Sequence, residues 1–256
     1  MRISDKFREL EGSGALIAYI CAGDPDTGSC LDACRQIIGA GADILELGLP
    51  FSDPMADGPT IQAASQRALD AGMNTDKYFG LAGKVHHIKD IPLVCMTYYN
   101  LLLQYGLDRF AGRCVESGIT GLIIPDLPLE EARPLLAACK GKGIDVIFLV
   151  AQTTTDERME RILEVAKGFV YVVALLGTTG ERDEVSDMLK PLLVRVRAKT
   201  SLPLAVGFGI AGPEHVRKVM GLGADAVIVG SAIIKRLAGG KPVGEFVRSL
   251  KDASSK

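Results

Sequence analysis

The chain has 256 residues, of which 48% are hydrophobic and 23% are charged, and its formal net charge is -2. A chain of this length can bury a sizeable core, either as one large domain or as two small ones. The near-neutral charge and the scatter of charged residues exclude the basic stripe that is typical of nucleic-acid-binding proteins. The first residues lack the pattern of a signal peptide, and no apolar run reaches the ~20 residues that cross a bilayer. We therefore expect a soluble, cytoplasmic protein that binds neither nucleic acid nor a membrane.

The cysteines and histidines do not have the spacing of a metal site or of a disulfide framework. The cysteines form no Cys-x-x-Cys pair and mostly lie in apolar segments, which predicts small core residues. The histidines fall in polar stretches and lack the spacing of zinc ligands. We therefore expect no bound metal. These residues are Cys21, Cys30, Cys34, Cys95, Cys114, Cys139, His86, His87 and His215.

Short apolar runs alternate with segments of helical periodicity along the whole chain. Runs that are apolar on both faces are typical of parallel strands covered by helices. The predicted strands are residues 15–22, 42–48, 91–98, 121–125, 145–151, 169–175, 202–207 and 224–230. The predicted helices are residues 29–38, 61–71, 108–117, 129–140, 156–166, 184–199 and 214–220.

Eight strand and helix units in about 250 residues predict an α/β protein, a (β/α)8 TIM barrel that forms a single domain over residues 1–256. A doubly wound open sheet is the main alternative, because the pattern alone does not show closure. Residues 4–11 are expected to form a short helix across the floor of the barrel, with Ser4 as its N-cap.

Two acidic residues stand where a barrel enzyme places its chemistry. Active sites of such barrels lie at the carboxyl ends of the strands. Glu46 is near the end of the second predicted strand, and Asp57 lies in the long loop 49–59, which three prolines stiffen. A lone Glu at a strand end is more often a salt-bridged rim residue, but a second carboxyl group in the next loop favours a catalytic pair.

Glycine-rich turns follow the last two predicted strands, at residues 207–210 and 230–233. Loops at these positions of a barrel often bind phosphate through backbone amides and a helix N-terminus. The alternative is that the glycines only form tight turns. Gly207, Gly209 and Gly212 also match a dinucleotide fingerprint, which we reject because no acidic ribose ligand ends the next strand. Residues 177–182 after strand six are a candidate lid.

Residues 46–62, ELGLPFSDPMADGPTIQ, resemble the signature of the tryptophan synthase alpha subunit family, ELGxPFSDPxADGPxIQ. The resemblance extends in order through residues 22–25, 96–100, 124–128 and 179–180 and through the two glycine turns. It implies retro-aldol cleavage of indole-3-glycerol phosphate to indole and glyceraldehyde 3-phosphate. The alternatives are another phosphosugar-binding barrel enzyme, such as one with a lysine acid at a strand end, and a catalytically idle subunit that activates a partner.

The resemblance also assigns roles to residues. Glu46 is the acid/base that protonates the indole ring, and Asp57 stays ionised near the indole N–H. Tyr171 and Thr179 orient the two acids beside the substrate. The indole is enclosed by Tyr19, Tyr98 and Phe208, and the phosphate is held by Gly180, Gly209, Gly230 and Ser231.

The family resemblance implies a partner as well. The alpha chain itself needs no cofactor, and it passes indole to a beta subunit that carries pyridoxal phosphate, in an alpha2-beta2 heterotetramer. The loop around residues 50–53 is where the family contacts this subunit.

Overall fold

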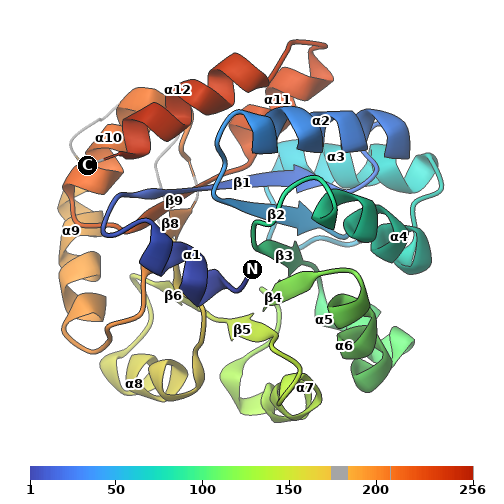
Figure 1. The fold of residues 1–256 in the computed structure, drawn as a ribbon. Helices are drawn as coiled ribbons and strands as arrows, with labels where there is room; N and C mark the ends of the chain where they lie inside the picture. Colours follow the sequence, from blue (N-terminus) through green and yellow to red (C-terminus); the bar gives the residue numbers. More distant parts are fainter. Residues whose placement is uncertain (174–183, 208, 256) are drawn as a thin grey trace.

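The computed structural model describes residues 1–173, 184–207 and 209–255, and it is a parallel β-barrel surrounded by helices (Figure 1). The order of neighbouring strands is β5-β4-β3-β2-β1-β9-β8-β7-β6, and every pair is parallel. The strands are β1 (Ala15–Cys21), β2 (Ile44–Gly48), β3 (Leu93–Met96), β4 (Ile119–Ile123), β5 (Asp145–Ile147), β6 (Leu149–Ala151), β7 (Val170–Val173), β8 (Leu204–Gly207) and β9 (Ala226–Val229).

The ring of strands is closed by the segment that contains Phe148. The predicted strand 145–151 consists of two short strands, β5 and β6, which are separated only by Phe148. β5 pairs with β4 and β6 pairs with β7, and the Tyr171 amide donates to the Phe148 carbonyl at 3.0 Å. One continuous segment therefore joins both ends of the sheet. The barrel prediction is confirmed, and the open doubly wound sheet is excluded.

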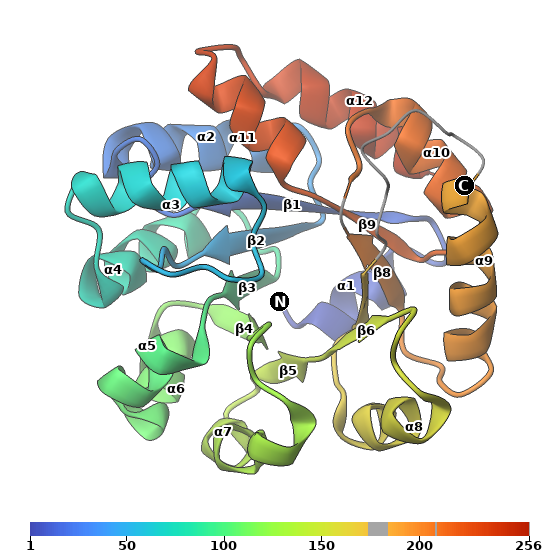
Figure 2. The same ribbon diagram turned by 180° about the vertical axis from the view of Figure 1, so that it is seen from behind.

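Helices surround this ring, and the first of them lies across one end of it, as Figures 1 and 2 show from opposite sides. The helices are α1 (Ile3–Glu9), α2 (Thr27–Gly39), α3 (Pro59–Asp70), α4 (Thr75–His86), α5 (Tyr99–Tyr105), α6 (Leu107–Glu116), the 3-10 turn η1 (Leu129–Glu131), α7 (Arg133–Cys139), α8 (Asp156–Val165), α9 (Glu184–Arg197), α10 (Pro213–Gly221), α11 (Ser231–Ala238) and α12 (Gly244–Ser254).

The predicted helices are present, with three differences. The prediction of one helix over 129–140 was wrong, because Pro134 lacks an amide donor and therefore lies in the first turn of a new helix, α7, which begins at Arg133 after η1. Ser4 is not an N-cap, because α1 begins at Ile3 with Arg2 at the cap position and no side-chain cap. The sequence analysis also missed α4, α5 and α12. Each of them belongs to a pair of consecutive helices, whereas the analysis expected one helix after each strand.

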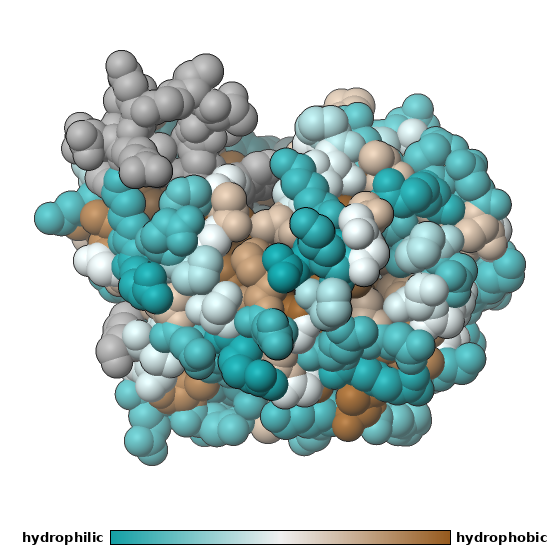
Figure 3. All heavy atoms as spheres, turned by 90° about the horizontal axis from the view of Figure 1, so that it is seen from above, coloured by the Kyte–Doolittle hydropathy of each residue, from teal (hydrophilic) through white to brown (hydrophobic). Residues whose placement is uncertain are grey.

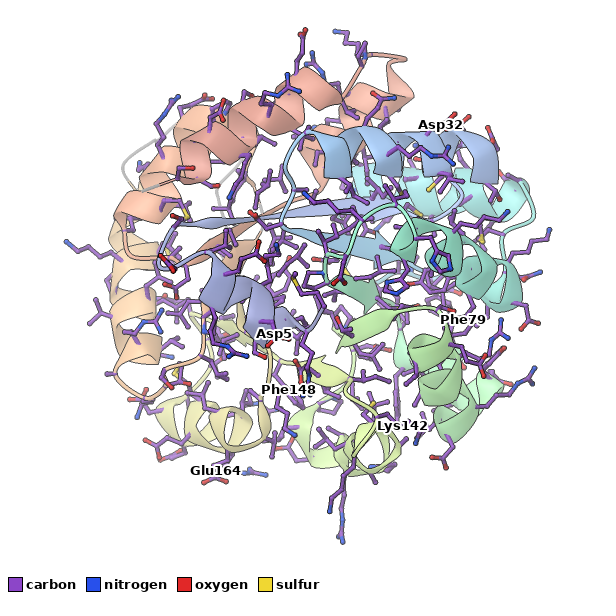
Figure 4. The ribbon with its side chains drawn as sticks, viewed as in Figure 1. Asp5, Asp32, Phe79, Lys142, Phe148 and Glu164 are labelled. Carbon is purple, nitrogen blue, oxygen red and sulfur yellow. The ribbon has the colours of Figure 1, made fainter. Side chains whose placement is uncertain are left out.

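Apolar side chains fill two layers. One layer fills the inside of the barrel, where α1 closes the floor and Phe7 packs edge-on against Phe169 with 6.3 Å between ring centroids. The other layer lies between the strands and the surrounding helices. Figure 4 shows Asp32 and Glu164 on the outer faces of their helices, and Phe148 beside the ring of strands. All six cysteines are buried and unpaired, which confirms their predicted role as core residues.

Candidate active site

Glu46 is a buried carboxyl group inside the barrel. Its place on β2 puts it between Tyr19 of β1 and Val94 of β3, and only 1% of its surface is exposed. Its Oε2 atom has no hydrogen-bond partner among the described residues. Burial, and then the charge of Asp57, raises the pKa of Glu46 to about 8. At neutral pH this group is therefore an acid that holds its proton.

Asp57 lies between β2 and α3 and is only partly buried. Its backbone is fixed at both ends, because its amide donates to the Pro54 carbonyl at 3.1 Å and its carbonyl accepts from the Gln62 side chain at 2.8 Å. Burial raises the pKa of Asp57 to about 6, and interaction with the Tyr98 hydroxyl acts in the opposite direction. Asp57 is therefore ionised at the pH at which Glu46 is protonated, so the two carboxyl groups suit different tasks.

The end of β3 holds the loop that carries Asp57. The Tyr98 hydroxyl accepts a hydrogen bond from the Ala56 amide at 3.0 Å, and its ring stacks on Phe51 with 5.2 Å between centroids. The buried Thr97 hydroxyl donates to the Leu49 carbonyl at 3.1 Å. The prolines predicted a stiff loop. The two hydrogen bonds that hold it join residues 42 and 48 positions apart, so no local sequence pattern reveals them.

Two tyrosines each lie over the last glycine of the next strand: Tyr19 of β1 over Gly48 of β2, and Tyr171 of β7 over Gly207 of β8. Tyr19 and Tyr171 are 5% and 6% exposed. A Cβ atom on Gly48 would lie 2.3 Å from the Tyr19 hydroxyl oxygen, and one on Gly207 would lie 2.2 Å from that of Tyr171. Any larger side chain would displace the tyrosines, so these two positions require glycine.

One cavity of about 1530 Å³ joins most of the predicted site residues. Its inner end contains Glu46 and Asp57 together with Tyr19 and Tyr171, and its apolar walls include Met96, Ile210 and Ile228. Gly209, Gly230 and Ser231 line the same cavity. Tyr98 is not among the described residues that line it, and its observed contacts are with the Asp57 loop.

The other end of the cavity has the features of an anion site. Gly209 has φ +73°, a left-handed conformation that glycine adopts without strain. Gly230 is the N-cap of α11, and Ser231 is the first residue of that helix. The first amides of a helix have no partner inside it, and the helix dipole favours negative charge there. A phosphate group bound here would accept hydrogen bonds from these amides and would be stabilised by the helix dipole.

Three of the predicted residues, Thr179, Gly180 and Phe208, lie outside the described residues. Over residues 1–173, 184–207 and 209–255, no group of three His, Cys, Asp or Glu side chains is arranged to hold a metal ion. In the same ranges, none of the helices is long and apolar enough to span a membrane.

Comparisons with known proteins point to one family. The sequence model described as tryptophan synthase alpha chain matches residues 7–251. The tryptophan synthase alpha chain of Methanosarcina barkeri is 50% identical over 251 residues, which cover 97% of this chain and 94% of the relative. The alpha chain of a Picosynechococcus species is 44% identical over 259 residues, covering 98% of each chain.

Solved structures give the same result. The alpha subunit of tryptophan synthase from Legionella pneumophila superposes with a TM-score of 0.90 at 36% identity, covering 99% of this chain and 98% of the other. A chain of tryptophan synthase from M. tuberculosis superposes with a TM-score of 0.92 at 33% identity, covering 100% and 98%. The chain belongs to the tryptophan synthase alpha chain family.

Proposed function

We propose that this chain cleaves indole-3-glycerol phosphate to indole and glyceraldehyde 3-phosphate, with Glu46 as acid/base and Asp57 as a fixed anion. The observation that carries the proposal is the presence of two carboxyl groups in different surroundings at the inner end of the cavity, one fully buried with a pKa of about 8 and one partly buried with a pKa of about 6. The reaction also needs a binding site for the phosphate of the substrate, and the glycine turns at the other end of the cavity would supply it.

The reaction needs one proton delivered and one removed. The Glu46 carboxyl group protonates C3 of the indole ring, and the ring becomes a cation. Asp57 stabilises that charge near the ring nitrogen, in a site where little water screens it. The carboxylate of Glu46 then takes the proton of the hydroxyl group on the adjacent side-chain carbon. That carbon becomes an aldehyde as the carbon–carbon bond breaks, and the electron pair of the bond returns to the ring and neutralises it.

The remaining assignments come from the family resemblance, and part of the cavity lining agrees with them. Tyr19 and Tyr171 line the cavity beside the two acids. Tyr19 would enclose the indole ring together with Phe208, and Tyr171 would orient the acids. Gly209, Gly230 and Ser231 would hold the phosphate together with Gly180. Tyr98 would act through Asp57, and Thr179 would orient the two acids.

The test uses Glu46→Gln and Asp57→Asn, with indole release as the measurement. Each variant is expected to lose most of its activity, because one removes the proton donor and the other removes the anion. The exposed carboxylates Glu164 and Asp32 provide matched controls, Glu164→Gln and Asp32→Asn, which should retain activity. Full indole release by Glu46→Gln or by Asp57→Asn would contradict the role assigned to that residue.

We further propose that the chain binds a beta subunit carrying pyridoxal phosphate, in an alpha2-beta2 assembly, and passes indole to it. Met55, in the loop between β2 and α3, is 88% exposed, and it lies two residues after the segment 50–53 at which the resemblance places the contact with this subunit. Charging this side chain in Met55→Glu should weaken binding of a beta subunit in sedimentation experiments. Unchanged binding would place the contact elsewhere.

Assays with a beta subunit also distinguish a catalytic chain from a catalytically idle subunit that only activates its partner. If the wild-type chain activates a beta subunit but releases no indole, it is an activating subunit without its own chemistry. Loss of indole release together with retained activation in Glu46→Gln is the result expected for a catalyst.

A further inference from the structure

The cavity continues past the glycine turns, along the outside of the barrel between α10 and α11. Ser231, Lys235 and Gly239 lie four residues apart on α11 and just after it, so they share one face of that segment. The Lys241 amide donates to the Arg236 carbonyl at 3.0 Å, which turns the chain back beside α11. Among the described residues that line this outer part are Lys218, Lys235, Arg236, Lys241 and Phe246.

Charge is distributed unevenly along this cavity. Glu46 and Asp57 lie at the inner end, whereas the described lining residues of the outer end carry mainly positive charge. Glu214 also lines the cavity, and its carboxylate is folded back onto Gly212, where a Cβ atom would lie 2.7 Å from it. Figure 3 views the molecule from above, onto the side where Figure 1 places α11 and α12, and shows mostly hydrophilic side chains.

The cations of the outer end differ in what they contact. Arg236 is engaged, because its Nε donates to the Pro242 carbonyl at 2.9 Å and its guanidinium lies 5.2 Å from the centre of the Phe246 ring. Lys218 also has an interaction partner. The exposed ammonium groups of Lys235 and Lys241 make no hydrogen bond or ion pair with the described residues, although both side chains line the cavity.

We propose that Lys235 and Lys241 form a cationic approach to the phosphate end of the cavity, which attracts the dianionic phosphate of the substrate and speeds its capture. The inference rests on the proposed function, because it assumes that the phosphate binds at Gly209, Gly230 and Ser231. Like-signed charges beside a cleft raise the rate at which an oppositely charged ligand associates, and the effect falls as salt screens it. The lysines touch no reacting atom, so they affect capture and leave the chemical step unchanged.

The experiment compares the wild-type chain with the double variant Lys235→Gln/Lys241→Gln. The value of kcat/KM for indole-3-glycerol phosphate at low salt should fall about three- to tenfold, while kcat stays the same. The difference should nearly vanish at 1 M salt, where the screening length is about 3 Å. In the reverse direction, KM should rise for glyceraldehyde 3-phosphate but not for indole, which carries no charge.

A matched control removes two positive charges elsewhere. Lys84 on α4 and Lys140 after α7 are also exposed, and neither lines the cavity, so Lys84→Gln/Lys140→Gln should leave kcat/KM and its salt dependence unchanged. Lys235→Arg/Lys241→Arg should behave like the wild-type chain, because the charges remain. Lys235→Glu/Lys241→Glu should reduce kcat/KM further than the glutamine pair.

The outcomes separate this inference from the proposed function. If the wild-type chain releases no indole, the proposed function fails. If it releases indole and the glutamine pair at 235 and 241 matches the control pair at every salt concentration, the two lysines are ordinary solvated side chains and the inference is overturned. A fall in kcat with no change in the salt dependence would also overturn it.

Discussion

Tyr19 lies directly beside Glu46, because β1 and β2 pair in register at these two residues. The ring of Tyr19 reaches past Glu46 toward the end of β2, where its hydroxyl passes close to Gly48. This arrangement buries the carboxyl group without giving its Oε2 atom a partner among the described residues. A buried carboxyl group without a partner retains its proton more strongly, which is what an acid catalyst working near neutral pH requires.

Activity should depend on pH with a bell-shaped profile. Burial and the neighbouring charge raise the pKa of Glu46 to about 8, and burial raises the pKa of Asp57 to about 6. Below pH 6 Asp57 gains a proton and its charge is lost, and above pH 8 Glu46 loses the proton that it must donate. We expect kcat/KM to be greatest between these values, with the two limbs belonging to the pair. A profile that is flat from pH 5 to pH 9 would rule out this division of tasks.

Tyr98→Phe should impair catalysis through Asp57. The substitution removes the acceptor for the Ala56 amide and the hydroxyl that keeps the pKa of Asp57 from rising further. We expect kcat to fall about tenfold, since the loop loses its fixed position, and the acidic limb to move to higher pH. Tyr105→Phe is the control, because its hydroxyl donates to Asp76 at 2.6 Å in an exposed contact. An unchanged acidic limb would show that Tyr98 does not act on Asp57.

Glu46→Gln should stabilise the protein increasingly as pH rises. The folded pKa of about 8 lies above the ordinary value of 4.5, so the folded chain holds more protons than the unfolded chain between these values. The wild-type chain therefore loses stability as pH rises through this window, and a neutral glutamine does not.

We expect the melting temperature of Glu46→Gln to exceed that of the wild-type chain more at pH 9 than at pH 5, with a difference of a few kcal/mol in unfolding free energy at the higher pH. Glu164→Gln, at an exposed position, should show no such trend. An equal effect of Glu46→Gln at both pH values would mean that the buried carboxyl group is not responsible.

Gly48→Ala should destabilise the barrel beside the active site. The new Cβ atom would lie 2.3 Å from the Tyr19 hydroxyl oxygen, so the ring must move. We expect a loss of about 1–3 kcal/mol in the free energy of unfolding, measured with urea. Adding Tyr19→Phe should recover part of the loss, because it removes the nearest atom.

The control for this prediction is Gly80→Ala on the exposed side of α4, where no atom lies within 4 Å of the added Cβ. There the substitution should stabilise the helix by about 0.5–1 kcal/mol, since alanine favours helix. If Gly48→Ala behaves like Gly80→Ala, the close packing against Tyr19 is not a constraint.

The barrel could be predicted from the sequence because the patterns that indicate strands and helices are local. Apolar runs and helical periodicity repeat within about ten residues, so the positions of the strands could be found before any contact was known. Glu46 at the end of a strand and the glycines near 207 and 230 could be located in the same way. The errors lie where local patterns compete, as at Pro134, which divides one predicted helix into η1 and α7.

Local sequence alone therefore determined the class of fold, the approximate positions of the strands and the residue types at their ends. Only the tertiary structure decided that Tyr19 stands beside Glu46, that the Tyr98 hydroxyl holds Ala56, and that the ring closes at Phe148. Strand register and barrel closure join segments that are far apart in the chain, so no local spacing encodes them. The raised pKa values also come from burial, which exists only after the whole barrel has removed water from around the two carboxyl groups.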